Sequence, residues 1–598
     1  MNAGRGLADA RSAMSSGIGE LRSGEAGEAR SEFARANDRL TQATGYFGHP
    51  GYRVLARLPF IGADARAARS LAAAAGLLSG VGTELAALAH DLSGEHGAIG
   101  DGLIENGRLR LDQLQSAGEV LVSVHRDVVR ATEVLAATPA PRLGVLRDAM
   151  SAAHHGATGA EETLRKVSAV AGAATDLFGG DGPRRYLLAF QAPSEARGSG
   201  GLFGLFAILE MNDGAIKIGN ISRPPEALLA SDAPQIVPVE APDWFVSKYE
   251  SEGSLWNSSE VNLSPHFPTV AAALLRMYEQ VEDLRLDGVL ALDPNALASL
   301  MAATGPIDTP GLGTITSTNA ERSIMRDSYV ELTPEEQNVN LGLLLDELFA
   351  RLRAGDVDGA AFLQGVGEAA SGGNLKFYVR DADSADALSI AEADGDFTDF
   401  GPIQQMVWHN SSSVSKIDWF LHRTLETVVR LQPDGSAQVT TRILVENRAP
   451  DGPPSLLLGG LAEGYPAGSN RMRLDMFIPR GARLTSCKDG ETEVQPERGE
   501  EAGYPTAWLN VIMGPRSERL FEITYEVDRA VDVEDAEVFG FTLYPHAAVR
   551  PDGYLLTIYP PDGYRLRKVG SFEEPSEFVQ ITGLLAGPST LEVELARL

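Results

Sequence analysis

The sequence predicts a multidomain α+β protein with three parts in chain order. We expect a helical bundle over residues 1–180, an α/β domain over residues 184–418 and one or two antiparallel β-sandwich modules over residues 419–598. Apolar residues follow a helical period in the first part, strands alternate with helices in the second, and strands separated by short turns fill the third. A chain of 598 residues is also too long for one hydrophobic core.

The N-terminal part shows helical spacing of small and apolar residues. Ala29, Phe33, Ala36 and Leu40 fall on one face of a helix. Bundles of Ala-rich antiparallel helices serve as scaffolds more often than as catalytic sites, so we expect a scaffold here. The expected helices span residues 7–46, a short stretch before the turn at 58–62, and residues 63–92, 103–138 and 142–177.

A glycine-rich segment joins two expected strands of the central domain, at residues 186–190 and 205–211. It places Glu195 and Arg197 beside four glycines, Gly198, Gly200, Gly201 and Gly204. Backbone N–H groups beside glycines can approach an anion closely, and an Arg guanidinium can bind it through two hydrogen bonds. The alternative is that the glycines only allow two strands and a loop to pack tightly, since their spacing matches neither a Walker nor a Rossmann motif.

The remaining central elements follow from periodicity and capping. Asp293 and Pro294 predict the N-cap and first residue of a helix. The long irregular segment at 222–267 contains two tryptophans, which favours an ordered loop. Gly179 to Pro183 predicts a linker at the domain boundary. The other expected elements are a strand at 215–219, a helix at 269–281, a strand at 286–291, and helices at 294–304 and 337–354.

The C-terminal part alternates apolar and polar residues, which is typical of half-buried strands. Val439, Thr441, Ile443 and Val445 share one face of a hairpin strand. No turn carries a ligand signature, so we expect a spacer or an assembly contact. The expected strands span residues 424–431, 437–447, 473–478, 507–513, 520–527, 554–559 and 591–595.

Charge and cysteine content exclude several classes of function. The net charge is −31, and residues 181–598 carry 33 Lys and Arg against 62 Asp and Glu, a net of −29. A chain this acidic is not expected to bind nucleic acid. The only cysteine, Cys487, can form no intramolecular disulfide and no Cys-rich zinc site. No stretch reaches the ~18 consecutive apolar residues of a membrane span, and the first ten residues have no signal-peptide core, so the sequence as written predicts a soluble chain.

Several motifs together resemble a known family. Tyr-Leu-Leu-Ala-Phe-Gln at 186–191 and Glu-Ala-Arg-Gly-Ser-Gly-Gly at 195–201 are similar to the signature of the domain of unknown function 4012 family, common in actinobacterial envelope proteins. Further matches occur in the family's order at residues 286–289, 292–294, 303–306 and 415–418. The resemblance implies an extracytoplasmic, anchored or secreted envelope protein. Because family members usually begin with a membrane helix, it also implies an anchor before Met1.

The central domain of that family is similar to the LytR-CpsA-Psr phosphotransferases, which move lipid-linked glycopolymers onto peptidoglycan. This similarity implies Arg and Asp side chains that hold a pyrophosphate and a divalent cation, Mg²⁺, if the protein is catalytic. Arg197 is the best counterpart of a phosphate-binding Arg, and Glu195 and Asp287 are the best carboxylates for a metal. Gly200 and Gly201 would present backbone N–H groups to the phosphate, and the weaker candidates for phosphate binding are Arg223, Arg322 and Arg326.

Departures from the family pattern favour a divergent or non-catalytic member. Ala192 replaces an expected Asn, His266 replaces an expected Asp, and Asn338 and Asn340 stand where an Arg or Lys would help to bind phosphate. We therefore expect an envelope-assembly protein that binds lipid-linked glycopolymer, its pyrophosphate or other envelope proteins. The alternative is a phosphotransferase that attaches glycopolymer to the cell wall. The polar stretch from His409 to Asp418 is expected to be a domain junction.

Overall fold

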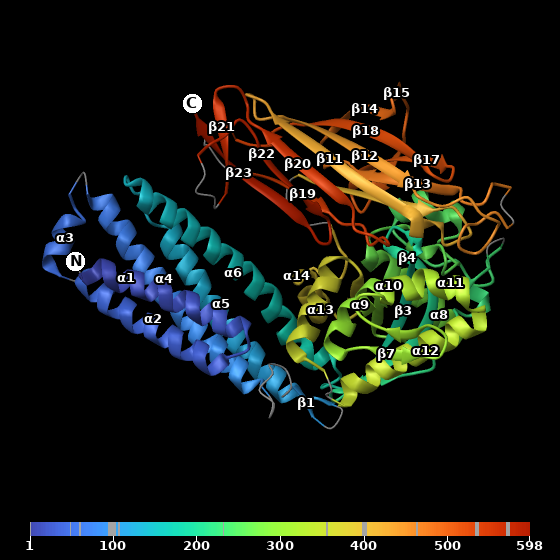
Figure 1. Cartoon of the computed structure of the whole chain (residues 1–598), viewed down its shortest axis with the longest axis horizontal. Helices are drawn as coiled ribbons and strands as arrows, with labels where there is room; N and C mark the ends of the chain where they lie inside the picture. The colour runs from blue at the N-terminus through green and yellow to red at the C-terminus, as the bar shows by residue number, and fades with distance from the viewer. Residues whose placement is uncertain are drawn as a thin grey trace.

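The computed structural model describes the chain except residues 1, 48, 59–60, 94–102, 106–107, 231–232, 355–356, 398–402, 462–463, 533–537 and 570–573 (Figure 1). Helices make up the first part, a sheet flanked by helices the second, and two stacked sheets the third. The multidomain α+β organisation predicted from the sequence is therefore confirmed.

Among the described residues of the N-terminal part, six helices form the bundle: α1 (Asn2–Arg22), α2 (Ala26–Phe47), α3 (Pro50–Leu55), α4 (Gly62–Asp91), α5 (Leu111–Ala136) and α6 (Gly144–Leu177). The single helix expected at 7–46 is two helices, because Gly24 adopts a left-handed φ of 85° that ends α1. The helix expected from residue 103 begins at Leu111, after the short strands β1 (Ile104–Glu105) and β2 (Arg108–Leu109).

Helix α4 packs against α2 and α5 inside this bundle. Within the part of the chain that is described, it is the one helix long and apolar enough, by length and composition, to cross a membrane. A helix at the centre of a bundle meets the same criterion, because its alanines and leucines face neighbouring helices. Buried Ala67, Ala74 and Ala131 form part of that core.

The central sheet has the strand order β1-β2-β5-β4-β3-β6-β9. Strand β3 pairs antiparallel with β4 and parallel with β6. Side chains alternate along β3, so Leu187 and Ala189 pack towards α8, while Leu188 and Phe190 pack towards α9 and α12. The strands not yet given are β3 (Arg184–Arg197), β4 (Gly200–Asn212), β5 (Ala215–Ile218), β6 (Gly288–Leu292) and β9 (Leu375–Val379).

Helices cover both faces of this sheet. Helix α9 begins as predicted, with Asp293 Oδ1 accepting hydrogen bonds from the backbone N–H groups of Asn295 and Ala296. The predicted long loop is ordered where it is described, and it contains α7. The helices are α7 (Asp243–Tyr249), α8 (Phe267–Glu282), α9 (Pro294–Thr304), α10 (Ala320–Arg322), α11 (Ser328–Glu331), α12 (Pro334–Ala354), α13 (Gly359–Ser371) and α14 (Ala382–Ile390), with the hairpin β7 (Ile307–Thr309) and β8 (Gly313–Ile315) between α9 and α10.

The connection expected to be an open linker is held against the sheet. The carbonyl of Gly179 accepts a hydrogen bond from Asp213 N–H, and the carbonyl of Phe178 accepts one from Gly214 N–H. Gly179 is buried and has a φ of 76°. Helix α6 is therefore fastened to the turn between β4 and β5 before the chain enters β3.

Where it is described, the C-terminal part is one β-sandwich of two seven-stranded sheets, ordered β16-β17-β13-β10-β19-β23-β21 and β15-β14-β18-β12-β11-β20-β22. Leu425, Ile443, Phe521 and Phe541 belong to the core between them. The strands are β10 (Gln404–Ser411), β11 (Leu421–Leu431), β12 (Ala437–Asn447), β13 (Asn470–Phe477), β14 (Arg483–Asp489), β15 (Thr492–Glu493), β16 (Glu497–Glu501), β17 (Tyr504–Met513), β18 (Ser517–Val527), β19 (Val538–Tyr544), β20 (Gly553–Tyr559), β21 (Tyr564–Lys568), β22 (Val579–Leu584) and β23 (Ser589–Arg597).

Two features of the sandwich differ from the expectation. Strand β10, expected in the central domain, pairs with β13 and β19, so the sandwich begins before residue 418. The sheets are mixed rather than purely antiparallel, because β10 runs parallel to β19 and β11 runs parallel to β20. Both parallel pairs join strands more than a hundred residues apart, a pairing that no local turn signal reveals.

Candidate functional site

The glycine-rich segment is the tight end of a β-hairpin rather than an open loop. Strands β3 and β4 extend through it and leave only Gly198 and Ser199 between them. A Cβ atom on Gly201 would lie 2.1 Å from the backbone carbon of Ala192, and one on Gly198 would lie 2.2 Å from the carbonyl oxygen of Leu263. These distances support the alternative stated above, that the glycines are required for close packing.

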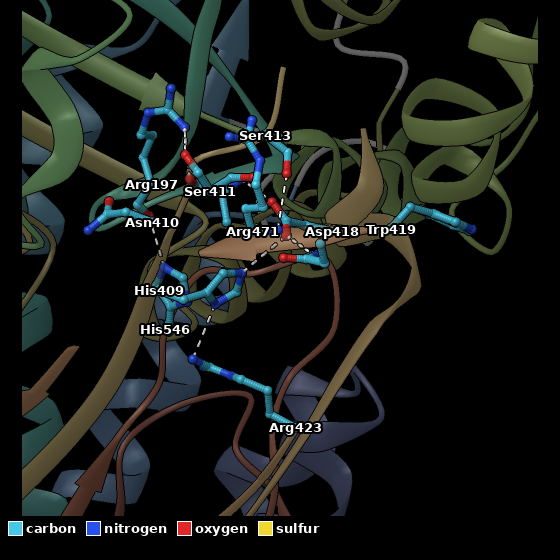
Figure 2. Close-up of polar contacts among 12 residues, drawn as sticks. Arg197, His409, Asn410, Ser411, Ser413, Asp418, Trp419, Arg423, Arg471 and His546 are labelled. Carbon is cyan, nitrogen blue, oxygen red and sulfur yellow. Dashed lines mark hydrogen bonds and ion pairs between the residues drawn. The ribbon is translucent and has the colours of Figure 1, made fainter. Parts of the chain in front are cut away.

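Backbone N–H groups around this turn donate to acceptors of the chain itself. Ala196 N–H donates to Asp418 Oδ2 at 2.9 Å, and Gly198 N–H donates to Asn410 Oδ1 at 2.8 Å. Figure 2 shows Asn410 beside Arg197 at this junction, with Asp418 farther along, beyond Ser411 and Arg471. The side chains of the polar stretch 409–418 thus satisfy backbone groups between domains, as the sequence analysis expected.

The guanidinium of Arg197 is buried and surrounded by protein acceptors. Its Nε donates to the carbonyl of Ser259 at 3.1 Å, and its Nη1 donates to the carbonyls of Ala196 and Ser411 at 3.1 Å each. Its Nη2 forms an ion pair with Glu260 Oε1 at 3.1 Å. Each of the three nitrogens therefore has an acceptor within the chain, which is the arrangement of a structural arginine.

The structure does not bring the two proposed metal ligands together. Glu195 pairs with Lys416 near the end of β3. Asp287 Oδ2 accepts a hydrogen bond from the backbone N–H of Arg185 at 2.7 Å, near the start of the same strand. Ten residues of strand separate these positions, roughly 30 Å. Among the described residues there is no group of three or more His, Cys, Asp or Glu that could hold a metal ion.

The remaining arginine candidates have different surroundings. Arg322 and Arg326 both pair with Asp327, at 3.0 Å and 2.7 Å. Arg223 is exposed and lines a cavity in the central domain. Of the residues proposed for phosphate or metal binding, Arg223 is the one that borders this cavity.

The cavity lies between the sheet and the helices α9, α11 and α12, and it measures about 370 Å³. That volume falls within the range of small-molecule sites. Its apolar walls include Leu202 and Leu205 of β4, Leu292 of β6, Leu297 of α9, and Leu341 and Leu344 of α12. Its polar lining includes Gln191, Ser194, Arg223, Asp293, Tyr329 and Lys416.

Lys416 carries a positive charge at this lining. Its Nζ lies 4.7 Å from the ring centre of Tyr329 and is paired with Glu195. Burial is the largest single influence on the pKa of Lys416 and lowers it, but the charge of Glu195, Tyr329 and the hydrogen bonds to both together outweigh burial, so the pKa is raised overall. The lysine therefore stays protonated at neutral pH. The nearby hydroxyl of Ser194 is buried and has no partner among the described residues.

Asp293 contributes a carboxyl group to the cavity lining. Burial raises the pKa of Asp293 to about 6, although hydrogen bonds from Ala296 N–H and from Asn374 lower it in part. Both carboxylate oxygens already accept hydrogen bonds: Oδ1 from the backbone N–H groups of Asn295 and Ala296, and Oδ2 from the side-chain amide of Asn374. The chamber thus has apolar walls and a lining with two cations, Arg223 and Lys416, the carboxyl group of Asp293 and neutral polar groups, which suits an amphiphile that has an anionic or polar head.

The positions at which the chain differs from the expected family pattern have identifiable roles. Ala192 and Asn338 line the cavity, and His266 caps α8 by accepting a hydrogen bond from Thr269 N–H. Sequence reasoning missed Ser194, Tyr329 and the leucines of α12, because they reach the cavity from segments that share no local motif. The available signals were Arg223, the departing positions Ala192 and Asn338, and the motifs at 292–294 and 415–418, which contain Asp293 and Lys416.

A second buried polar cluster joins the central domain to the sandwich. The Nε2 of His546 donates to the carbonyl of Arg197 at 2.8 Å, and Arg423 pairs with Asp552 at 2.7 Å. Figure 2 shows Arg423 pointing towards the adjacent imidazoles of His409 and His546. Burial, followed by the charge of Arg423, lowers the pKa of His546 to about 3. Burial, followed by the charge of Arg423, also lowers the pKa of His409 well below its usual value, so both rings are neutral at physiological pH.

Comparison with solved structures adds little to this picture. A putative nutrient-binding protein of Legionella pneumophila is 11% identical, with a TM-score of 0.21 over 32% of this chain and 70% of that one. Leukotriene A4 hydrolase of Saccharomyces cerevisiae is 7% identical, with a TM-score of 0.19 over 29% of each chain. An M1 zinc metallopeptidase of Deinococcus radiodurans is 12% identical, with a TM-score of 0.17 over 31% of this chain and 42% of that one. Similarity this low supports no functional transfer.

No curated protein matches the sequence. The comparison with family models does give a match, and it covers β3, β4, β6 and α9, which contribute to the cavity lining, but it ends before α12. It supports the first resemblance drawn from the motifs at 186–191 and 195–201. Residues 181–329 match DUF4012, a family described only as a protein of unknown function.

Proposed function

We propose that the protein is an extracytoplasmic envelope protein that binds a lipid-linked glycopolymer or its polyprenyl-pyrophosphate carrier, and that it acts as a binding protein rather than a transferase. The observation that carries this proposal is the cavity of about 370 Å³, with leucine-rich walls and two cations, Arg223 and Lys416, in its lining. An apolar tail would fill the chamber, and a pyrophosphate would be attracted to the cations.

The energetics favour such an amphiphile. Each methylene group transferred from water to the leucine walls contributes about 0.8 kcal/mol. Lys416 is already paired with Glu195, so it contributes less attraction than a free ammonium would. Arg223 has an exposed side chain that can form a two-pronged hydrogen bond with phosphate oxygens. Binding of the head group therefore depends on Arg223 more than on Lys416.

The surroundings of the proposed catalytic residues favour binding over transfer. Arg197 donates to carbonyls of the chain, Glu195 pairs with Lys416, and Asp287 lies near the far end of β3. None of the three lines the cavity. A phosphotransferase would need a cation and a metal-binding carboxylate placed together at the reacting phosphate.

Filling the cavity tests the proposal. A Cβ atom on Gly204 would meet no heavy atom within 4 Å, and Gly204 lines the chamber, so Gly204→Leu places a side chain in that open space. We expect at least a tenfold loss of affinity for a polyprenyl-pyrophosphate in a direct titration. Gly172→Leu on exposed α6, where a Cβ also meets nothing, is the matched control and should bind normally. Equal binding by both variants would contradict the proposal.

The head group is tested separately with Arg223→Ala. This change should weaken binding of the polyprenyl-pyrophosphate while leaving binding of the corresponding uncharged polyprenol unchanged. If both ligands lose affinity equally, Arg223 shapes the cavity and does not hold the phosphate. If the native protein binds neither ligand, the cavity serves another class of molecule.

A further inference from the structure

The end of the helical bundle farthest from the central domain exposes large apolar side chains. We call this surface the bundle tip, and it comprises α3, the end of α2, the start of α4 and the connection between α5 and α6. Val145 is 83% exposed, Val54 63% and Leu143 58%. The side chains of Tyr46, Leu58 and Ile61 are also exposed on this surface.

Contacts place the two halves of the bundle tip side by side. Asp64, in the first turn of α4, accepts hydrogen bonds through Oδ1 from the backbone N–H groups of Arg142 and Leu143, at 2.7 Å and 3.0 Å. The connection between α5 and α6 is therefore held against the start of α4. Figure 1 shows α3 at the end of the bundle that projects away from the central domain.

The same surface is basic, in contrast to the rest of the chain. The described side chains of residues 54–70 and 133–148 include five arginines against Asp64, Glu133 and Asp148, a net of +2, whereas the whole chain carries −31. Asp64 is buried and accepts backbone hydrogen bonds, and Asp148 lies 4.0 Å from Arg567 of β21. Arg57, Arg69 and Arg147 are exposed among the apolar side chains.

We infer that the bundle tip docks onto the surface of a bilayer rich in anionic lipid. Exposed valine, leucine and isoleucine side chains enter the boundary between head groups and acyl chains, and Tyr46 suits the same depth. Arginines between them bind lipid phosphates, and each basic residue near such a surface strengthens binding by about fivefold. Nucleic acid would use the arginines and leave the apolar side chains in water, so a lipid surface fits both properties.

Vesicle co-sedimentation of the complete chain tests this inference. We expect the protein to sediment with equimolar phosphatidylglycerol and phosphatidylcholine vesicles, and at least tenfold less with pure phosphatidylcholine. The double variant Val54→Asp and Val145→Asp places two charges on exposed positions, where folding should be unaffected. It should lose most of the sedimentation, and Arg57→Glu should weaken it and reduce its dependence on anionic lipid.

The control is Leu584→Asp on β22, which changes an equally exposed apolar residue of the sandwich. This variant should sediment like the native chain. The inference would be overturned if all variants sedimented equally, or if the native protein sedimented equally with anionic and with neutral vesicles. It would also be overturned if ultracentrifugation showed dimers that Val145→Asp dissociates, or if the tip bound duplex DNA and no vesicles. None of these results depends on the cavity, so the inference and the proposed function fail independently.

Discussion

Arg197 has the sequence neighbours expected of an anion-binding residue, but in the fold it has a structural role. Its acceptors include the carbonyls of Ser259 and Ser411, which lie 62 and 214 residues away along the chain. A local motif identifies a guanidinium beside glycines but not what it contacts. Lys416 is the converse case, because its place in the cavity lining depends on packing against Tyr329 and Glu195.

We predict that Arg197→Ala lowers the free energy of unfolding by about 3 kcal/mol, because it leaves buried carbonyls without donors and Glu260 without its partner. Arg197→Lys should restore only part of this loss, since an ammonium cannot reproduce the planar set of donors. Thermal or urea unfolding measures both variants. Arg223→Ala, an exposed arginine, is the control and should unfold normally. Arg197 would bind ligand instead if its variants unfolded normally and lost affinity for polyprenyl-pyrophosphate.

At the scale of elements, periodicity predicted well wherever one face of a helix or strand is buried. Helices α8, α9 and α12 and the main strands of the sandwich lie close to their expected positions. The glycine-rich part of β3 and β4 was missed because glycine disfavours strands, and here its lack of a side chain is used for close packing. Strand β10 was assigned to the wrong domain because its partners, β13 and β19, are distant in sequence.

Two glycines of β4 allow a test of whether close packing requires glycine in this hairpin. We predict that Gly201→Ala destabilises the protein by about 3 kcal/mol, because its Cβ would lie 2.1 Å from the backbone of Ala192, which cannot move freely inside a paired strand. Gly204→Ala, three residues along the same strand, meets nothing within 4 Å and should be neutral or slightly stabilising. Urea midpoints of the two variants give the comparison. Similar midpoints would mean that the hairpin adjusts to a side chain at Gly201.

At the scale of the whole molecule, the multidomain α+β organisation could be predicted from length, composition and periodicity, but the contacts between parts could not. The central domain and the sandwich meet through His546 on one side and through Lys248 of α7 on another, where the lysine pairs with Asp475 and Glu501 at 3.2 Å and 3.0 Å. The cavity is also assembled from segments spread between residues 190 and 456. Such sites arise from packing across domains.

We predict that acid weakens this junction through His546. Because the pKa falls from 6.5 to about 3 on folding, the unfolded chain binds more protons between these values, and stability decreases as pH falls through that window. Between pH 7 and pH 4.5 the loss should be on the order of 2 kcal/mol. His546→Gln keeps a donor for the carbonyl of Arg197 but cannot titrate, so it should lose less stability on acidification. His90→Gln, at an exposed position of α4, should retain the native pH dependence; equal slopes for both variants would exclude His546 as the cause.

The length of the bundle has a consequence for how a lipid ligand could be loaded. Helix α4 has 30 residues and is about 45 Å long, so a bundle tip resting on a bilayer would keep the cavity at a comparable height above it. A polyprenyl tail would then have to leave the hydrocarbon interior completely before entering the protein. Each methylene group exposed to water on the way costs about 0.8 kcal/mol. The barrier to leaving the bilayer would therefore be high, and extraction of the lipid would be slow. Loading would be governed by the kinetics of desorption, as in a shuttle that carries one lipid at a time through water.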